Sequence, residues 1–287
     1  MTGRVEPDGI APLKGFRLVS LAVNVPGPVA AARLREMGAA VAKVEPPEGD
    51  PLATGSPAWY QALTEGQDVV RLNLKEPTGR ARLDELLHSA DLLLTSTRPD
   101  SLRRLGLDWP SLHPVYPHLC QVAIVGYPSP EENRAGHDLT YQAGLGLLRP
   151  PDLPRTLLAD LAGAEQAVSA ALALLLARER GGGAGYRQIA LAGAAAVLAA
   201  PLQYGLTVPG GVLGGGHPGY GLYQAAGGGW VAVAVLEPHF LQRLQEELDL
   251  MQVSRESLAA VFATRTAEDW EMWAAERGLP IALVAAS

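Results

Sequence analysis

The sequence predicts an α/β protein: a large domain built on a parallel sheet with helices on its faces, followed by a smaller α+β domain. Two observations carry this prediction. In the first 125 residues, short apolar segments alternate with segments that have helix-start signals, a pattern typical of parallel strands joined by helices. From residue 206 the composition becomes rich in glycine and proline, which indicates a boundary between domains.

Five apolar segments of the first half are predicted as strands, because each is short and bounded by polar or turn residues. They are residues 16–22, 41–45, 68–74, 91–96 and 119–125. Helices are expected at 29–37, 76–87 and 101–105. Pro26-Gly27-Pro28 should end the first strand and open the first helix, and Gly38 suits its C-cap. In such sheets, ligands bind beyond the carboxyl ends of the strands.

The second half predicts one long apolar helix and a small terminal domain. The helix is expected from Asp160 to Arg180, and an alanine-rich strand and helix from Ile189 to Gln203. A glycine turn at 227–229 separates two short strands, and two helices follow at 238–249 and 266–277. The predicted limits are a large domain at 1–205, a linker at 206–221 and a small α+β domain at 222–287.

The composition of the 287-residue chain argues against several protein classes. A net charge of −7 disfavours a general nucleic-acid binder, which needs a basic stripe. The N-terminus has no signal-peptide core, and the apolar stretch 162–177 is short for a membrane span. The single Cys120 suits a reducing compartment and a buried structural thiol, and metal-ligand spacing is absent from the sequence. We therefore expect a cytoplasmic protein without a membrane, metal or nucleic-acid partner.

Three acidic or imidazole residues stand in distinctive phrases. His137 lies in Gly136-His137-Asp138-Leu139-Thr140-Tyr141, Asp160 in Leu158-Ala159-Asp160-Leu161, and Glu237 in Leu236-Glu237-Pro238. A His, an Asp and a Glu can form two opposed acid/base groups that remove a proton from one face of a carbon and return it on the other. The structural alternatives are a helix N-cap for Asp160, a loop position for His137, an Asx turn at Asp138 and a helix start at Glu237.

These phrases, in this order, resemble the class III CoA-transferase family, of the L-carnitine dehydratase and bile-acid-inducible protein F type. Within it they are most similar to the α-methylacyl-CoA racemase branch. Further matching phrases lie at 13–19, 26–30, 37–47, 72–75 and 98–107. The resemblance implies a Rossmann-like large domain, a small domain, CoA thioesters bound between them, and a homodimer of interlocked chains. Compared with the family pattern, the chain is expected to be shortened at its C-terminus and lacks a basic segment before residue 68.

The resemblance also implies roles for individual residues. Asp160 matches the family's catalytic aspartate, His137 the catalytic histidine of the racemase branch, and Glu237 the glutamate that supports it. The residues that match the CoA site are Leu72, Asn73, Leu74, Lys75, Arg98, Gly136, Asp138 and Tyr141. Without the resemblance, Lys75 and Arg98 would be solvated charges. The acyl-CoA is the expected substrate, coenzyme A enters as part of it, and no permanently bound cofactor is expected.

Two chemistries and one non-catalytic reading follow from the resemblance. The main expectation is a racemase, in which His137 and Asp160 move the proton next to the thioester and the N–H groups at the start of the Asp160 helix stabilise the enolate oxygen. The alternative is a CoA-transferase, in which Asp160 is the nucleophile that forms an anhydride and then a thioester with CoA. The third reading is a degenerate relative that binds CoA thioesters without catalysis.

Overall fold

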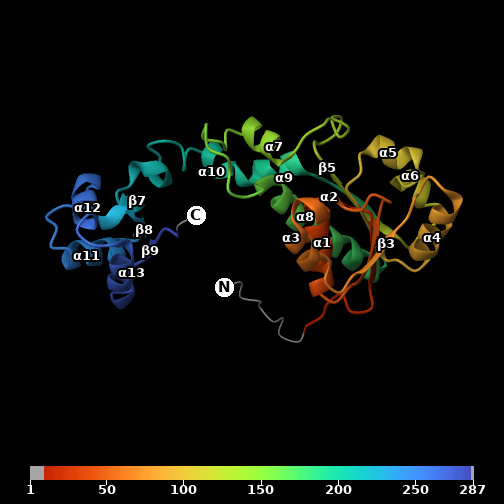
Figure 1. Cartoon of the computed structure of the whole chain (residues 1–287), viewed down its shortest axis with the longest axis horizontal. Coiled ribbons are helices and arrows are strands. Elements are labelled where there is room, and N and C mark those ends of the chain that lie inside the picture. Colours follow the sequence, from red (N-terminus) through yellow and green to blue (C-terminus); the bar gives the residue numbers. More distant parts are fainter. Residues whose placement is uncertain (1–9, 286–287) are drawn as a thin grey trace. The chain divides into compact units, whose positions relative to one another are not determined.

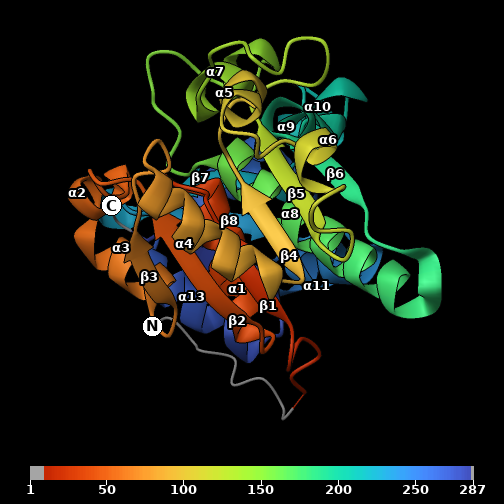
Figure 2. The ribbon, with the colours of Figure 1, turned by 90° about the vertical axis from the view of Figure 1, so that its right-hand side faces the viewer.

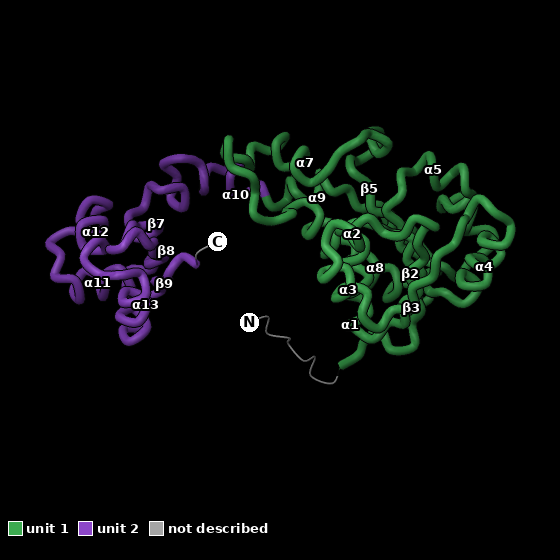
Figure 3. The backbone as a smooth tube through the Cα atoms, in the orientation of Figure 1, with its two compact units in different colours: residues 1–198 green, residues 199–287 purple. Residues whose placement is uncertain are grey.

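The structure is a computed structural model that describes residues 10–285. The chain divides into two compact units, residues 1–198 and 199–287, which are coloured separately in Figure 3. The division falls before the predicted end of the large domain at residue 205.

The first unit is built on a six-stranded parallel sheet (Figures 1 and 2). Its strands are β1 Arg17–Ser20, β2 Ala40–Glu45, β3 Asp68–Arg71, β4 Leu92–Thr95, β5 Cys120–Val125 and β6 Tyr186–Ala190. Their order is β3-β2-β1-β4-β5-β6, and every neighbouring pair is parallel. This confirms the predicted α/β class and its five strands of the first half. The order reverses direction between β1 and β4, as in Rossmann-like sheets.

Helices connect the strands of the first unit. They are α1 Pro26–Glu36, α2 Pro51–Gly55, α3 Pro57–Thr64, α4 Pro77–His88, α5 Pro99–Arg104, α6 Trp109–Leu112, α7 Asp138–Gly144, α8 Leu158–Ala177, which runs into η1 Arg178–Gly182, and α9 Leu191–Leu198. The sequence did not predict α2 and α3. Both begin at a proline, and the Asp50 side chain caps α2 by accepting a hydrogen bond from Leu52 N. Pro26-Gly27-Pro28, predicted to end the first strand and open the helix, forms the first turn of α1.

Side-chain alternation along the strands places a helix layer on each face of the sheet. Leu18 of β1 and Leu92 of β4 lie in one core with residues of α1 and α8, among them Leu34 and Val168. The next residues along, Val19 and Leu93, face a second core that includes Leu83 and Leu87 of α4. Successive strand side chains point to opposite faces, so an apolar strand needs cover on both sides.

Helix α8 is the long apolar helix that the sequence predicts. With η1 it covers Leu158–Gly182 and is long and apolar enough, by length and composition alone, to cross a membrane. One face of α8 is buried in the core against α1, α9 and β5. A core helix of this composition passes the same test, so the finding is weak evidence for a membrane span.

The second unit contains a three-stranded antiparallel sheet in the order β7-β8-β9. Its elements are α10 Ala200–Gln203, η2 Val212–Gly216, β7 Tyr220–Gln224, η3 Ala226–Gly228, β8 Trp230–Ala234, α11 Pro238–Glu247, α12 Arg255–Phe262, α13 Ala267–Glu276 and β9 Ile281–Leu283. Val231 and Val233 of β8 pack with Phe262 and Trp270 in a core of its own. The prediction of a small α+β unit is confirmed. Helix α12 was missed, although its Ser254 cap is a recognisable start signal.

Gly27 provides a test of how tightly α1 packs on the end of β1. A methyl group at this position would overlap the Ala22 side chain, which is fixed directly to the backbone and cannot turn away. We expect Gly27→Ala to lower the free energy of unfolding by about 1–3 kcal/mol, measured by urea denaturation, because overpacking forces backbone shifts. Gly55→Ala is the matched control: it lies in α2 with open space around it, and should be neutral or slightly stabilising. Equal stabilities of the two variants would contradict the packing argument.

Candidate active site

A pocket opens beyond the carboxyl ends of the central strands, where the strand order reverses. The chain segments that follow β1, β4 and β5 all contribute to its wall, including Val23, Ser96 and Gly126. Its volume is about 220 Å³. Chains leaving β1 and β4 depart in opposite directions at such a reversal, and the gap between them is where open α/β sheets bind ligands.

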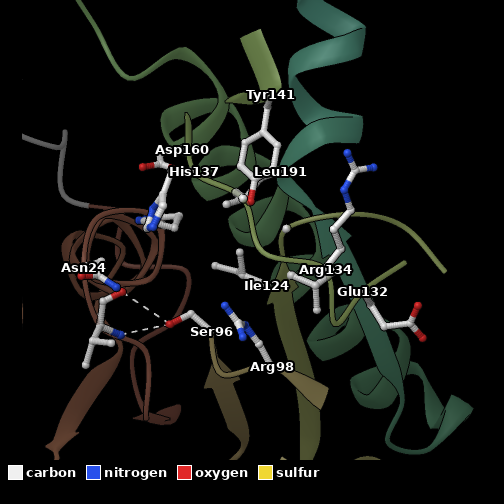
Figure 4. Close-up of a pocket in the computed structure, with 15 residues that line it drawn as sticks. Asn24, Ser96, Arg98, Ile124, Glu132, Arg134, His137, Tyr141, Asp160 and Leu191 are labelled. Atoms are coloured by element: carbon white, nitrogen blue, oxygen red, sulfur yellow. Dashed lines mark hydrogen bonds between the residues drawn. The ribbon is translucent and has the colours of Figure 1, made fainter. Parts of the chain in front are cut away.

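Five of the residues singled out in the sequence line this pocket (Figure 4): Arg98, Gly136, His137, Tyr141 and Asp160. His137 is the residue before α7, and Asp160 is the third residue of α8. The fold thus brings together two phrases that lie more than twenty residues apart in the chain. Leu157, and not Asp160, is the N-cap of α8, so the alternative that Asp160 is a helix cap is wrong.

Asp138 holds the start of α8. It is 5% exposed, and its Oδ1 accepts hydrogen bonds from Ala159 N at 2.7 Å and Asp160 N at 3.1 Å. Its Oδ2 accepts a third from Gln142 Nε2 at 2.5 Å. A carboxylate at a helix N-terminus satisfies donors that have no partner within the helix and is favoured by the helix dipole. Because Asp138 follows His137 directly, it also sets the position of His137 relative to Asp160.

This arrangement corrects the predicted site for an enolate oxygen. The N–H groups of Ala159 and Asp160, expected to be free at the start of α8, are already bonded to Asp138. The next one, Leu161 N, donates to Leu157 O. These three N–H groups are therefore not free to bind a substrate oxygen.

The Asp160 carboxyl has an unusual environment. Its pKa is raised to about 6: burial is the largest cause, the nearby Asp138 carboxylate adds to the rise, and His137 opposes it. Within residues 10–285, no hydrogen bond reaches the Asp160 carboxylate, so the group is available to a ligand. A carboxylate that is partly desolvated and left without donors is more basic than usual, which suits a base or a nucleophile.

Tyr141 is a buried part of the pocket wall. Its ring meets Tyr127 edge-on at 5.1 Å between centroids. The pKa of Tyr141 is raised to about 12: burial is the largest cause, Tyr127, Asp160 and Asp138 add to the rise, and Arg98 opposes it. A side chain at Gly136 would overlap the Tyr141 ring, which explains why this position needs glycine.

Sequence reasoning missed several polar residues of the pocket. They are Asn24, Ser96, Glu132 and Arg134. The Arg134 guanidinium lies over the Tyr127 ring, 4.4 Å from its centroid, and pairs with Glu131 at 3.3 Å. The Ser96 hydroxyl accepts from Val23 N at 3.1 Å and so links the ends of β4 and β1. These residues lie in loops, where no periodic pattern marks them.

The remaining predicted residues lie elsewhere. Leu72, Asn73, Leu74 and Lys75 follow β3, the strand at the sheet edge, and do not line the pocket. Asn73 Nδ2 donates to Glu76 at 2.8 Å. Glu237 is the residue before α11 in the second unit, with no side-chain cap bond. The roles predicted for these five residues stay predictions. No group of three potential metal ligands occurs in the described part of the chain.

Removing the Asp138 carboxylate should loosen the start of α8. Asp138→Ala leaves one buried and one partly buried N–H group without a partner, and we expect the free energy of unfolding to fall by about 1–3 kcal/mol in urea denaturation. The control is Asp152→Ala, an exposed position whose side chain makes no hydrogen bond within the described residues, with an expected change of at most about 0.5 kcal/mol. If Asp138→Ala is as stable as the control, Asp138 does not support α8.

The raised pKa of Asp160 predicts how the stability of the fold changes with pH. The folded protein holds the Asp160 proton more tightly than the unfolded chain, so this group's contribution to stability is present below about pH 4 and is lost as pH rises through about 6. Asp160→Asn removes the charge. Its melting temperature should therefore exceed that of the wild type at pH 8, and the difference should vanish at pH 4. A difference that does not depend on pH, or a lower melting temperature at pH 8, would contradict the assigned pKa.

Comparison with known protein families gives a match over nearly the whole chain. Residues 13–287 match the profile of CoA-transferase family III. The succinate–glutarate CoA-transferase of Agrobacterium fabrum is 34% identical over 158 residues, which cover 50% of this chain and 40% of that protein. Human alpha-methylacyl-CoA racemase is 29% identical over 290 residues, 90% of this chain and 74% of the racemase. The chain spans about half the length, or less, of the first curated relatives that it matches.

The fold has a solved counterpart. The crystal structure of the hypothetical protein Rv3272 from Mycobacterium tuberculosis matches 96% of this chain and 86% of its own, with a TM-score of 0.85 and 24% identity. The structural similarity shows a shared fold, and the family profile matches residues 13–287 of the sequence. The pocket, its Asp160 and His137 phrases and the matched profile lead to one conclusion: the chain belongs to CoA-transferase family III.

Proposed function

We propose that the protein is an acyl-CoA enzyme that transfers CoA between carboxylic acids, with Asp160 as the nucleophile. The observation that carries the proposal is the Asp160 carboxylate itself, which lines the pocket without a hydrogen bond from the described residues and has a pKa of about 6. The names of the relatives support the same class, since most of the curated proteins matched are CoA-transferases.

The proposed reaction balances at each step. An Asp160 oxygen attacks the thioester carbonyl, the C–S bond breaks, and CoA leaves as a thiolate while a mixed anhydride forms. The thiolate then attacks the Asp160 carbonyl carbon, which gives an aspartyl thioester and releases the first acid as its carboxylate. The acceptor carboxylate attacks this thioester to form a second anhydride, and the returning thiolate takes the new acyl group and restores Asp160. None of these reaction steps involves oxidation or reduction.

The environment of Asp160 suits this role. At neutral pH a group with a pKa of about 6 is largely ionised, yet more basic than an exposed aspartate. Its backbone is fixed because Asp138 binds Asp160 N. A fixed nucleophile loses little conformational freedom on reaching the thioester, which lowers the barrier.

Proton transfer next to a thioester, the racemase reaction, is the second candidate. Two observations favour it: His137 and Asp160 line one pocket, and human alpha-methylacyl-CoA racemase matches 90% of the chain. In this reading one residue removes the α-proton and the other returns it. Support of His137 by Glu237 stays a prediction, as do the homodimer and the cytoplasmic location. The non-catalytic reading remains as the outcome in which neither reaction is found.

Two assays distinguish CoA transfer from proton exchange. In one assay the protein receives succinyl-CoA with labelled glutarate, and label entering the CoA pool reports transfer. In the other, a chiral 2-methylacyl-CoA is incubated in deuterated water, and label at the α-carbon reports proton exchange. Asp160→Asn should reduce either activity by about 10²-fold or more, because it removes both base and nucleophile.

His137→Ala distinguishes the two readings. It should abolish α-proton exchange in a racemase and leave most of the rate of a transferase. Asp152→Ala is the control for loss of an exposed carboxylate, since Asp152 does not line the pocket and its side chain makes no hydrogen bond within the described residues. Turnover of Asp160→Asn close to that of the wild type would rule out both mechanisms.

A further inference from the structure

Asn24 has a backbone conformation that its own side chain does not explain. It lies between β1 and α1 with φ at 69°, in the left-handed region. Asn24 and Asp249 are the two non-glycine residues with positive φ among residues 10–285. Such conformations cost free energy in non-glycine residues and persist where the surrounding structure imposes them, often at functional sites.

A buried ionic network imposes this conformation. Asn24 N donates to Asp50 Oδ1 at 2.9 Å, and Asp50 Oδ2 lies 2.7 Å from Lys43 Nζ. Lys43 also pairs with Glu45 at 2.9 Å, and the Tyr60 hydroxyl donates to Glu45 at 2.7 Å. The side chains of Lys43, Glu45 and Asp50 are at most 1% exposed. Charges this deeply buried are stable only when paired, so the network is rigid.

The carboxamide of Asn24 has no structural task within the part of the chain that is described. The N-cap of α1 is Val25, not Asn24, and no hydrogen bond from the Asn24 side chain occurs in residues 10–285. Glycine would adopt the same φ with less strain. Asn24 is exposed and is one of the residues that line the pocket, as are Asp160 and His137 (Figure 4).

Several hydrogen-bond donors in and beside the pocket already have partners. Ala159 N and Asp160 N are bonded to Asp138, and the Ser96 hydroxyl is bonded to Val23. The Asn24 amide supplies a neutral N–H donor on a fixed backbone. A neutral donor suits an oxygen that carries partial charge and must be released again, whereas a cation would hold it more strongly.

We propose that Asn24 is a substrate-contacting residue whose Nδ2 donates a hydrogen bond to a carboxyl-type oxygen: the thioester carbonyl of an acyl-CoA or a carboxylate oxygen of the free acid. The buried Lys43–Asp50 pair positions Asn24, because Asp50 binds the Asn24 backbone N–H. This inference rests on the proposed function, because it takes the pocket as the site of acyl transfer.

The test compares two variants with the wild type by isothermal titration, using the full chain. Asn24→Gly keeps the left-handed backbone and removes the amide. Asn24→Ala also removes the amide but strains the backbone, and should melt at a lower temperature than Asn24→Gly. The probes are butyryl-CoA, its thioether analogue S-butyl-CoA, which lacks the carbonyl oxygen, and free butyrate.

We expect Asn24→Gly to bind butyryl-CoA about five- to tenfold more weakly than the wild type, as for one lost hydrogen bond, with S-butyl-CoA binding and melting temperature unchanged. A loss confined to butyryl-CoA assigns the contact to the thioester, and a loss confined to butyrate assigns it to the acid. Equal loss for butyryl-CoA and S-butyl-CoA, or no loss for any probe, overturns the role of Asn24. A wild-type protein that binds none of the probes overturns the proposed function and this inference with it.

Discussion

The reversal of strand order between β1 and β4 is the constraint on which the site depends. Strands on either side of it continue into helices that leave in different directions, so the sheet cannot close the gap with its own connections. The two loops at the gap are tied to each other: Val23 N donates to the Ser96 hydroxyl, which donates in turn to Val23 O at 3.4 Å. This tie fixes the opening that becomes the pocket.

The hydrogen bonds of Asp138 to the start of α8 position the reactive carboxylate of Asp160. Asp138 joins the first turn of α7 to the first turn of α8 at the carboxyl end of the sheet. The same carboxylate that organises this junction also helps to keep the Asp160 pKa high, because like charges close together disfavour ionisation. Burial is the larger cause of the high pKa, and Asp138 contributes both to it and to the position of Asp160.

The sequence predicted what depends on local pattern. The apolar strands, the long α8 and the phrases around His137 and Asp160 could be recognised, since each is written in consecutive residues. The role of Asp138 could not, because its partners are backbone N–H groups more than twenty residues away. Asn24 also escaped notice, because its conformation is imposed by Asp50 and Lys43 across the fold. Helices α2 and α3 are too short to show a helical period.

Cys120 gives this sheet a built-in reporter. It is the sole cysteine of the sequence, it is 0% exposed, and it lies in β5 between β4 and β6. A thiol reagent can reach its sulfur only when the strands beside it separate, so the rate of labelling measures how often the sheet opens. Ligands that bind in the pocket at the ends of β4 and β5 would slow that opening, and thiol protection would then report binding without any catalytic assay.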